Sequence, residues 1–372
     1  MTSGIEATTS GPGPAARRLT WMLPLAASII WLVWVVGAGQ VARVVDHWAA
    51  GVTMLFGSFL AGSSPEGGGA VAFPVLTKGL HVPAAVARSF GLFIQAVGMT
   101  MAAVTIVLLG RPVHRRAIAV ATGAAIAGFL AGVAIWGDPD VAFWPASIGA
   151  PWIKATFSVV LATTSLMMLH MGRQIGLVSS RPSPWTRRHA LFLVGVALAG
   201  GLLSSLTGTG ANIVVFLFLV VLADVDAKTA LSTAIVVMAA VSIIGLVLFG
   251  GFDGQLDIEV ADGRVVQVGG QVVDFDAGES DLLGLWLAAV PVVVWGAPLG
   301  AWVASRVKES TLIGFVAVLA ATEVFTTFLL VPELRTDPAL IMFFVGGLVV
   351  GPVVLLGLRK RRHQVFGVVP IG

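Results

Sequence analysis

The amino-acid sequence predicts an all-α polytopic membrane protein, and three observations lead to this prediction. Of the 372 residues, 57% are hydrophobic and 11% are charged, whereas soluble domains carry about 25% charged residues. Apolar runs of about 20 residues recur along the chain, and a helix of that length crosses a bilayer with its backbone satisfied internally. The basic residues gather in short loops between these runs, as they do on the cytoplasmic side of membrane proteins.

A polar tail precedes the apolar runs. Residues 1–16 are rich in Gly, Ser, Thr and Pro, which is typical of a disordered tail. The first span, 17–42, opens with two arginines and exceeds the apolar region of about 7–15 residues in a signal peptide, so we expect a membrane span with a cytoplasmic N-terminus. Full crossings are expected at 20–42, 84–110, 115–136, 150–171, 227–250, 282–304, 311–331 and 338–358, ahead of a basic cytoplasmic tail at 359–372.

Two further apolar regions, 47–80 and 189–223, are too long for one simple crossing and are broken by glycines. The loops that carry basic residues are expected inside, at 111–116, 173–188 and 306–308. The acidic segment 251–281 is expected outside, and its alternating GRVVQVGGQVVDF predicts a small β-hairpin that turns at Gly269-Gly270. The first apolar region then begins and ends outside, and the second begins and ends inside. Each is therefore predicted to be a re-entrant hairpin, entering from opposite faces.

The two hairpin regions also align with each other at a gap-free offset of 143 positions. Residues 58–100 and 201–243 share ten identities over 43 positions, and the helix-breaking residues of one region align with those of the other. Chance matching among Ala, Val, Leu and Gly is the alternative explanation. A hairpin followed by three crossings then occurs twice, as repeat 1 (47–171) and an inverted repeat 2 (189–331). Glycine-interrupted segments at matching places in inverted halves indicate the binding site of a transporter.

The glycine-rich stretches SSPEGGGAVAFP (63–74) and SSLTGTGAN (204–212) are expected at the hairpin tips. Each tip would end one half-helix and start another near mid-membrane, exposing N–H groups with a partial positive charge. Glycine lets the backbone approach a ligand closely, so two such tips predict an anion site. Tight helix packing through small residues is the alternative, but it explains the Pro-Glu-Gly-Gly-Gly run poorly.

The predicted substrate-binding residues are the glycines of the tips together with nearby hydroxyl and amide groups. They are Ser63, Ser64, Gly67, Gly68, Gly69, Ser89, Thr207, Gly208, Thr209, Gly210, Asn212, Ser232 and Thr233. Back-bonding to helix carbonyls is the alternative role for Ser89, Ser232 and Thr233.

Three charged residues at membrane depth are candidates for ion coupling or charge pairing. Glu323 could be a proton-coupling carboxylate, or simply bond to a neighbouring helix. Glu66 would oppose anion binding unless it is protonated or paired. Arg88 could pair with Glu66 or clamp the substrate, with snorkelling to the outer surface as the alternative.

At these residues the chain resembles the sulfite exporter TauE/SafE family, also called TSUP. That family carries a glycine-rich motif followed by a proline near the start of each half. The matching positions here are Gly62, Gly67, Gly68, Gly69, Pro74, Ala87 and Ser89, and then Gly201, Ser205, Gly208, Gly210, Ala230, Ser232 and Thr233. The chain departs from the pattern at Pro65, Glu66, Ala211, Asn212 and Leu217. The resemblance implies transport of small sulfur-containing anions, such as sulfite, sulfonates, sulfoacetate or thiosulfate.

The expected function is therefore secondary transport of such an anion across the cytoplasmic membrane by alternating access. The chain has no G-x-x-x-x-G-K-[ST] motif, so the energy would come from the substrate gradient or from a proton or sodium gradient. Expected partners are the anion and the lipid bilayer, with a homodimer possible, and no nucleic acid is expected. An anion channel or a permease for a non-sulfur carboxylate remains the alternative.

An intramembrane enzyme is the third hypothesis, and the residue types disfavour it. The chain has no cysteine, no H-E-x-x-H motif, and six histidines that all lie near span ends or in loops. We therefore expect no catalytic residues, no metal and no cofactor.

Overall fold

A computed structural model describes residues 5–6, 13–136, 148–172, 185–252, 255–257, 259–261, 264–266, 272–274 and 281–366. Among these residues, nine helices are long and apolar enough to cross a membrane. They are α1 (Pro14–Gly37), α5 (Ala84–Leu108), α6 (Arg115–Trp136), α7 (Ala150–Gly172), α8 (Arg187–Thr207), α10 (Ala227–Gly245) with its π-helical extension η4 (Leu246–Phe252), α11 (Leu282–Ala304), α12 (Glu309–Leu330) and α14 (Pro338–Phe366). The prediction of an all-α polytopic membrane protein is confirmed.

Each glycine-broken region folds as a helix, a short tip and a second helix. In hairpin 1, α3 (Trp48–Ser63) is followed by α4 (Gly69–Pro74), which continues as the π-helical turn η1 (Val75–Gly79). In hairpin 2, α8 is followed by α9 (Ala211–Leu217), which continues as η3 (Phe218–Leu222). The breaks fall at Gly67, Gly208 and Gly210, whose φ angles of 71°, 77° and 137° lie in the region that favours glycine.

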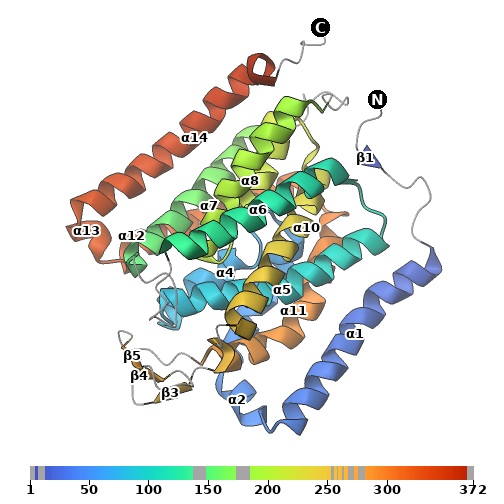
Figure 1. Ribbon diagram of the computed structural model, residues 1–372, viewed down its shortest axis with the longest axis vertical. Helices are drawn as coiled ribbons and strands as arrows, with labels where there is room; N and C mark the ends of the chain where they lie inside the picture. The colour runs from blue at the N-terminus through green and yellow to red at the C-terminus, as the bar shows by residue number, and fades with distance from the viewer. Residues whose placement is uncertain are drawn as a thin grey trace.

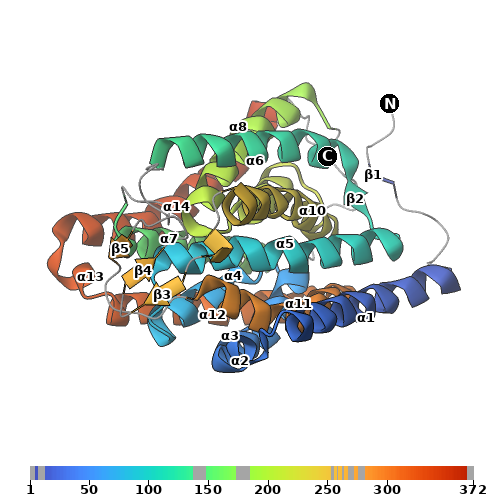
Figure 2. The same cartoon turned by 60° about the horizontal axis from the view of Figure 1, so that its bottom comes forward.

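The helices pack in tiers around a central pair, α5 and α10. Figure 2 shows α6 and α8 on one side of this pair and α11 with α3 on the other. The tiers approach closely because glycines remove side chains at the crossings: a Cβ on Gly62 would overlap the backbone of α11, and one on Gly201 would overlap the backbone of α6. Helix α7 packs between α12 and α14, and α1 covers α11 at the opposite edge (Figure 1).

The remaining elements are short and lie at the ends of the long helices. They are α2 (Val41–Asp46), α13 (Glu333–Thr336), the 3-10 turn η5 (Gln255–Asp257), and strands β1 (Ile5–Glu6), β2 (Val113–His114), β3 (Glu259–Ala261), β4 (Arg264–Val266) and β5 (Val272–Asp274). Strands β4 and β5 pair antiparallel, as the alternating acidic segment predicted, while the expected turn at Gly269-Gly270 lies outside the described residues. Helix α1 begins at Pro14, a residue that starts helices well.

Candidate functional site

The tips of the two hairpins touch each other beside the middle of α5. A Cβ on Gly67 would lie 3.1 Å from Asn212 Nδ2 and 3.4 Å from Gln95 Oε1. A Cβ on Gly69 would lie 3.2 Å from Thr209 Cγ2. A Cβ on Gly67 would also overlap Met99 of α5. Glycine therefore suits these places, because α5 and the opposing tip crowd the space that a side chain would take.

Asn212, in the first turn of α9, joins the two tips directly. Its Nδ2 donates to the carbonyl oxygen of Pro65 in the other hairpin at 2.8 Å. Its Oδ1 accepts from Gly210 N at 3.2 Å and from Thr209 Oγ1 at 3.3 Å, which holds the turn that precedes α9. The side chain is fully buried, so each of these bonds counts in a low-dielectric setting.

Gln95 of α5 completes the junction from the side. Its Nε2 donates to the carbonyl oxygens of Gly208 at 2.9 Å and Gly91 at 3.0 Å. Its Oε1 accepts from Thr209 Oγ1 at 3.4 Å. Gln95 therefore holds hairpin 2 against α5 at the point where hairpin 1 also arrives.

The tip of hairpin 1 holds two buried polar side chains. Ser64 and Glu66 are each 1% exposed. Among the described residues, they interact with each other and with the tip backbone, and neither has a hydrogen-bond partner from another helix. Burying a carboxylate with so few partners is costly, and in native proteins such a group calls for an explanation such as a bound ligand, water or ion.

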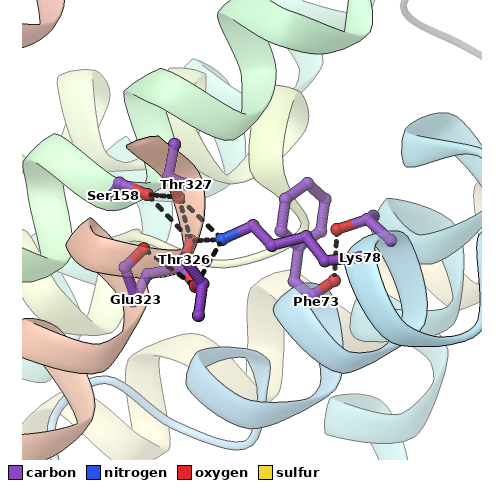
Figure 3. A network of polar contacts seen from close by, with 7 residues as sticks. Phe73, Lys78, Ser158, Glu323, Thr326 and Thr327 are labelled. Carbon is purple, nitrogen blue, oxygen red and sulfur yellow. Dashed lines mark hydrogen bonds and ion pairs between the residues drawn. The ribbon is translucent and has the colours of Figure 1, made fainter. Parts of the chain in front are cut away.

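A second polar cluster joins hairpin 1 to α12 and α7 (Figure 3). The ammonium group of Lys78 donates to Glu323 Oε1 at 2.7 Å, to Thr327 Oγ1 at 2.6 Å and to Thr326 Oγ1 at 3.2 Å. Ser158 of α7 donates to the same carboxylate oxygen at 2.8 Å. Both charged side chains are almost fully buried, with 4% and 3% of their surface exposed.

The sequence prediction included Glu323 and missed Lys78. Lys78 is a lone basic residue in the apolar run of hairpin 1, and that isolation was the available signal, since charges at membrane depth are rarely incidental.

The comparison with known families now decides the class of protein. The model of the sulfite exporter TauE/SafE family matches residues 49–326. The chain belongs to this family. The match runs from α3 into α12, so both hairpin tips and the Lys78–Glu323 pair lie inside the TauE/SafE region, while α1 and α14 lie outside it. No curated protein and no solved structure matches the chain.

TauE/SafE proteins are membrane transporters, so the chain is a multi-pass membrane protein of a sulfite and anion exporter family. Among the described residues, no group of three His, Asp or Glu could hold a metal ion. The polar groups that converge at membrane depth in this TauE/SafE protein are instead amides, hydroxyls and two ionisable clusters, one around Lys78 and one around Arg88.

Arg88 is buried in the protein, and the snorkelling alternative is therefore wrong. Its guanidinium donates to Ser89 Oγ at 3.1 Å and to the Ser205 carbonyl at 3.4 Å, and it lies 4.6 Å from the ring centroid of Phe249. It makes no hydrogen bond to Glu66. Partners from α8 and η4 make burial of the charge tolerable.

The other predicted binding residues fall into two groups. Ser63 and Thr207 lie next to the tips but bond to carbonyls of their own hairpins, at Phe59 and at Leu203 and Thr209, respectively. Ser89, Ser232 and Thr233 lie on α5 and α10. Ser89 donates to Gln255 at 2.7 Å, while Thr233 donates to the Thr229 carbonyl and accepts from His114 N. Thr233 thus back-bonds as the alternative role anticipated.

Proposed function

We propose that this TauE/SafE protein is a secondary transporter that moves a small sulfur-containing anion by alternating access, with the anion held where the two hairpin tips meet. The observation that carries the proposal is the junction of both tips at Asn212, Gln95 and the carbonyl of Pro65. Two segments far apart in the chain, each broken by glycine, meet at one buried point beside the buried side chains of Ser64 and Glu66.

The tips offer the donors that an oxyanion needs. The helix formed by α9 and η3 spans Ala211–Leu222 and starts at the junction, and that formed by α4 and η1 starts at Gly69. The first N–H groups of a helix have no partner within it and carry a partial positive charge, although here Ala211 N already donates to Ser204 Oγ and Ala70 N to the carbonyl of Gly67. Asn212 has a second Nδ2 hydrogen besides the one that it gives to Pro65, and Ser64 adds a hydroxyl, whereas Thr209 Oγ1 already donates to Gln95 and Asn212. The glycines of the tips, Gly67, Gly68, Gly208 and Gly210, allow close approach of the backbone.

Alternating access is supported by equivalent packing in the two halves. Gly62 of α3 fits against Ala297 and Ala301 of α11 in the way that Gly201 of α8 fits against Ala125 and Phe129 of α6. Gly62 and Gly201 are 139 positions apart, four fewer than the offset of 143 that aligns the tips, and their contact residues on α11 and α6 are 172 positions apart in both cases. We propose that the two halves are inverted repeats that rock against each other around the shared junction.

Glu66 gives the junction a requirement for a proton. An ionised carboxylate beside the tips would repel an anion. We therefore propose that Glu66 is protonated whenever an anion is bound and that it acts as a further donor. On this proposal the protein lies in the cytoplasmic membrane with both termini inside, as its basic loops indicate.

Calorimetry on the purified protein tests the site. Sulfite, thiosulfate, sulfoacetate and methanesulfonate are titrated into the wild type and into Asn212→Leu, Gln95→Leu and Gln40→Leu. The last substitution is the matched control, because Gln40 lies between α1 and α2, away from the hairpins. The proposal expects saturable binding that falls at least about tenfold in the first two variants, the loss of one or two buried hydrogen bonds. Unchanged binding in Asn212→Leu would contradict the placement of the site.

A further inference from the structure

The ion pair between Lys78 and Glu323 lies beside a cavity that the hairpin junction does not use. The cavity has a volume of about 300 Å³ and separates hairpin 1 from α12. Its lining includes Ala70 and Val71 at the start of α4, and Lys78, Glu323 and Thr326 farther along. It therefore runs from the first turn of the half-helix, next to the tip glycines, to the buried charges.

The hydrogen bonds leave one oxygen of Glu323 open. Lys78, Ser158 and Thr327 all donate to Oε1. Among the described residues, the hydrogen bonds to this carboxylate all end on Oε1 and none on Oε2, and Glu323 lines the cavity. A proton that reaches this carboxylate can thus bind at Oε2 without first displacing a donor.

The charge balance around Glu323 is simple. Lys78 faces it from hairpin 1, and Lys154 faces it from α7 at longer range. Lys154 is also within electrostatic reach of Glu333 on α13. The close pair is neutral as it stands, so Lys78 offers no net attraction to an anion while Glu323 is ionised.

Packing alone gives no reason for this pair. Hairpin 2 has Val221 at the position aligned with Lys78, and it is buried within the hydrophobic core. A similar hairpin is therefore built with an apolar side chain at this place. Buried ion pairs are often no more stabilising than apolar residues of similar volume, which favours a functional role for the charges in hairpin 1.

We propose that Lys78 and Glu323 form a proton-gated anion position on the path to the hairpin tips. A proton binds to Glu323 Oε2, the ion pair opens, and the ammonium group of Lys78 holds a monovalent anion in the cavity. Lys78 keeps its own proton, so the pair changes from net zero to net positive charge and the anion restores neutrality. One proton then enters the site with each anion, which makes the transporter proton-coupled. This inference rests on the proposed function and assigns its coupling residue.

The test measures protons taken up on binding of methanesulfonate, a monovalent sulfonate that does not titrate near neutral pH. Calorimetry in buffers of different ionisation enthalpy gives the number of protons. The wild type should take up about one proton per anion, and its affinity should rise about tenfold for each unit of pH lowered above the midpoint. Lys78→Met with Glu323→Gln, which leaves no unpaired charge, should bind more weakly and take up no proton. The exchanged pair, Lys78→Glu with Glu323→Lys, should restore the proton uptake.

A control variant separates the coupling pair from other charges. Lys154→Met should keep the proton uptake of the wild type. If the neutral double variant kept the wild-type proton uptake and pH slope, the pair would be structural and the inference would be overturned. It would also be overturned if methanesulfonate failed to bind the wild type at any pH. The proposed function would survive either result, provided that another sulfur anion bound in an Asn212-dependent manner.

Discussion

Replacing Lys78 by Met should destabilise the folded protein strongly. The substitution removes an ammonium group that lies 2.7 Å from Glu323, in a pair whose side chains are 4% and 3% exposed. Truncating one partner of a buried pair leaves the other charge uncompensated, which costs about 3–5 kcal/mol. Glu323 keeps its hydrogen bonds from Ser158 and Thr327, so we expect a loss near the lower end, about 3 kcal/mol.

A double-mutant cycle tests this reasoning. The free energy of unfolding is measured in one detergent for the wild type, Lys78→Met, Glu323→Gln and the double variant. Because the double variant removes both charges of the pair and leaves neither one uncompensated, it should lie within about 1 kcal/mol of the wild type. Lys154→Met, at a half-buried lysine of α7 without a close ion pair among the described residues, should have a small effect. Costs that simply add within about 0.5 kcal/mol would refute the coupling.

Three further predictions follow from the packing and the charges. Gly201→Ala should prevent close packing of α8 on α6 and lower the melting temperature. Gly195 lies on the same helix next to open space, so Gly195→Ala should stabilise the folded protein by up to about 1 kcal/mol. Equal changes in melting temperature for the two variants would contradict the packing. Gly208→Ala should destabilise by more than about 1 kcal/mol, because its φ of 77° disfavours a side chain and a Cβ would overlap the α5 backbone, and chemical unfolding would measure the change. Burial lowers the pKa of His114. Below about pH 6.5 the unfolded chain therefore binds a proton that the folded chain does not, and the folded protein loses stability as the pH is lowered. His114→Gln should reduce the loss in melting temperature between about pH 7.5 and 5.5, and the exposed His81→Gln should not.

Sequence patterns predicted those features of the fold that depend on residues close together in the sequence. Run lengths located the eight expected crossings, and the glycines at 67 and 208–210 marked the breaks, because span length and backbone conformation depend on neighbouring residues. The breaks lie inside the stretches 63–74 and 204–212 that were predicted as tips. In the structure Gly67 lies close to Asn212, and the two tips touch there.

Pairings between distant side chains could not be predicted in the same way. Lys78 and Glu323 are 245 positions apart, and only the packing of α12 against hairpin 1 brings them together. Arg88 could be expected at the outer surface from its place near a span's start, but carbonyl and aromatic partners from α8 and η4 hold it inside. Thr233 aligned with the binding motif, yet its helix turns the hydroxyl toward Thr229 and the loop that holds His114.

Counterflow of radiolabelled sulfite into proteoliposomes tests the central claim most directly. With unlabelled sulfite inside, the wild type should show saturable accumulation of label, because a carrier that alternates around one site exchanges its substrate. Asn212→Leu should abolish this exchange and Gln40→Leu should retain it, since only the first residue joins the two tips. Flux that rises linearly with concentration, or exchange that survives in Asn212→Leu, would contradict transport through the paired hairpin tips.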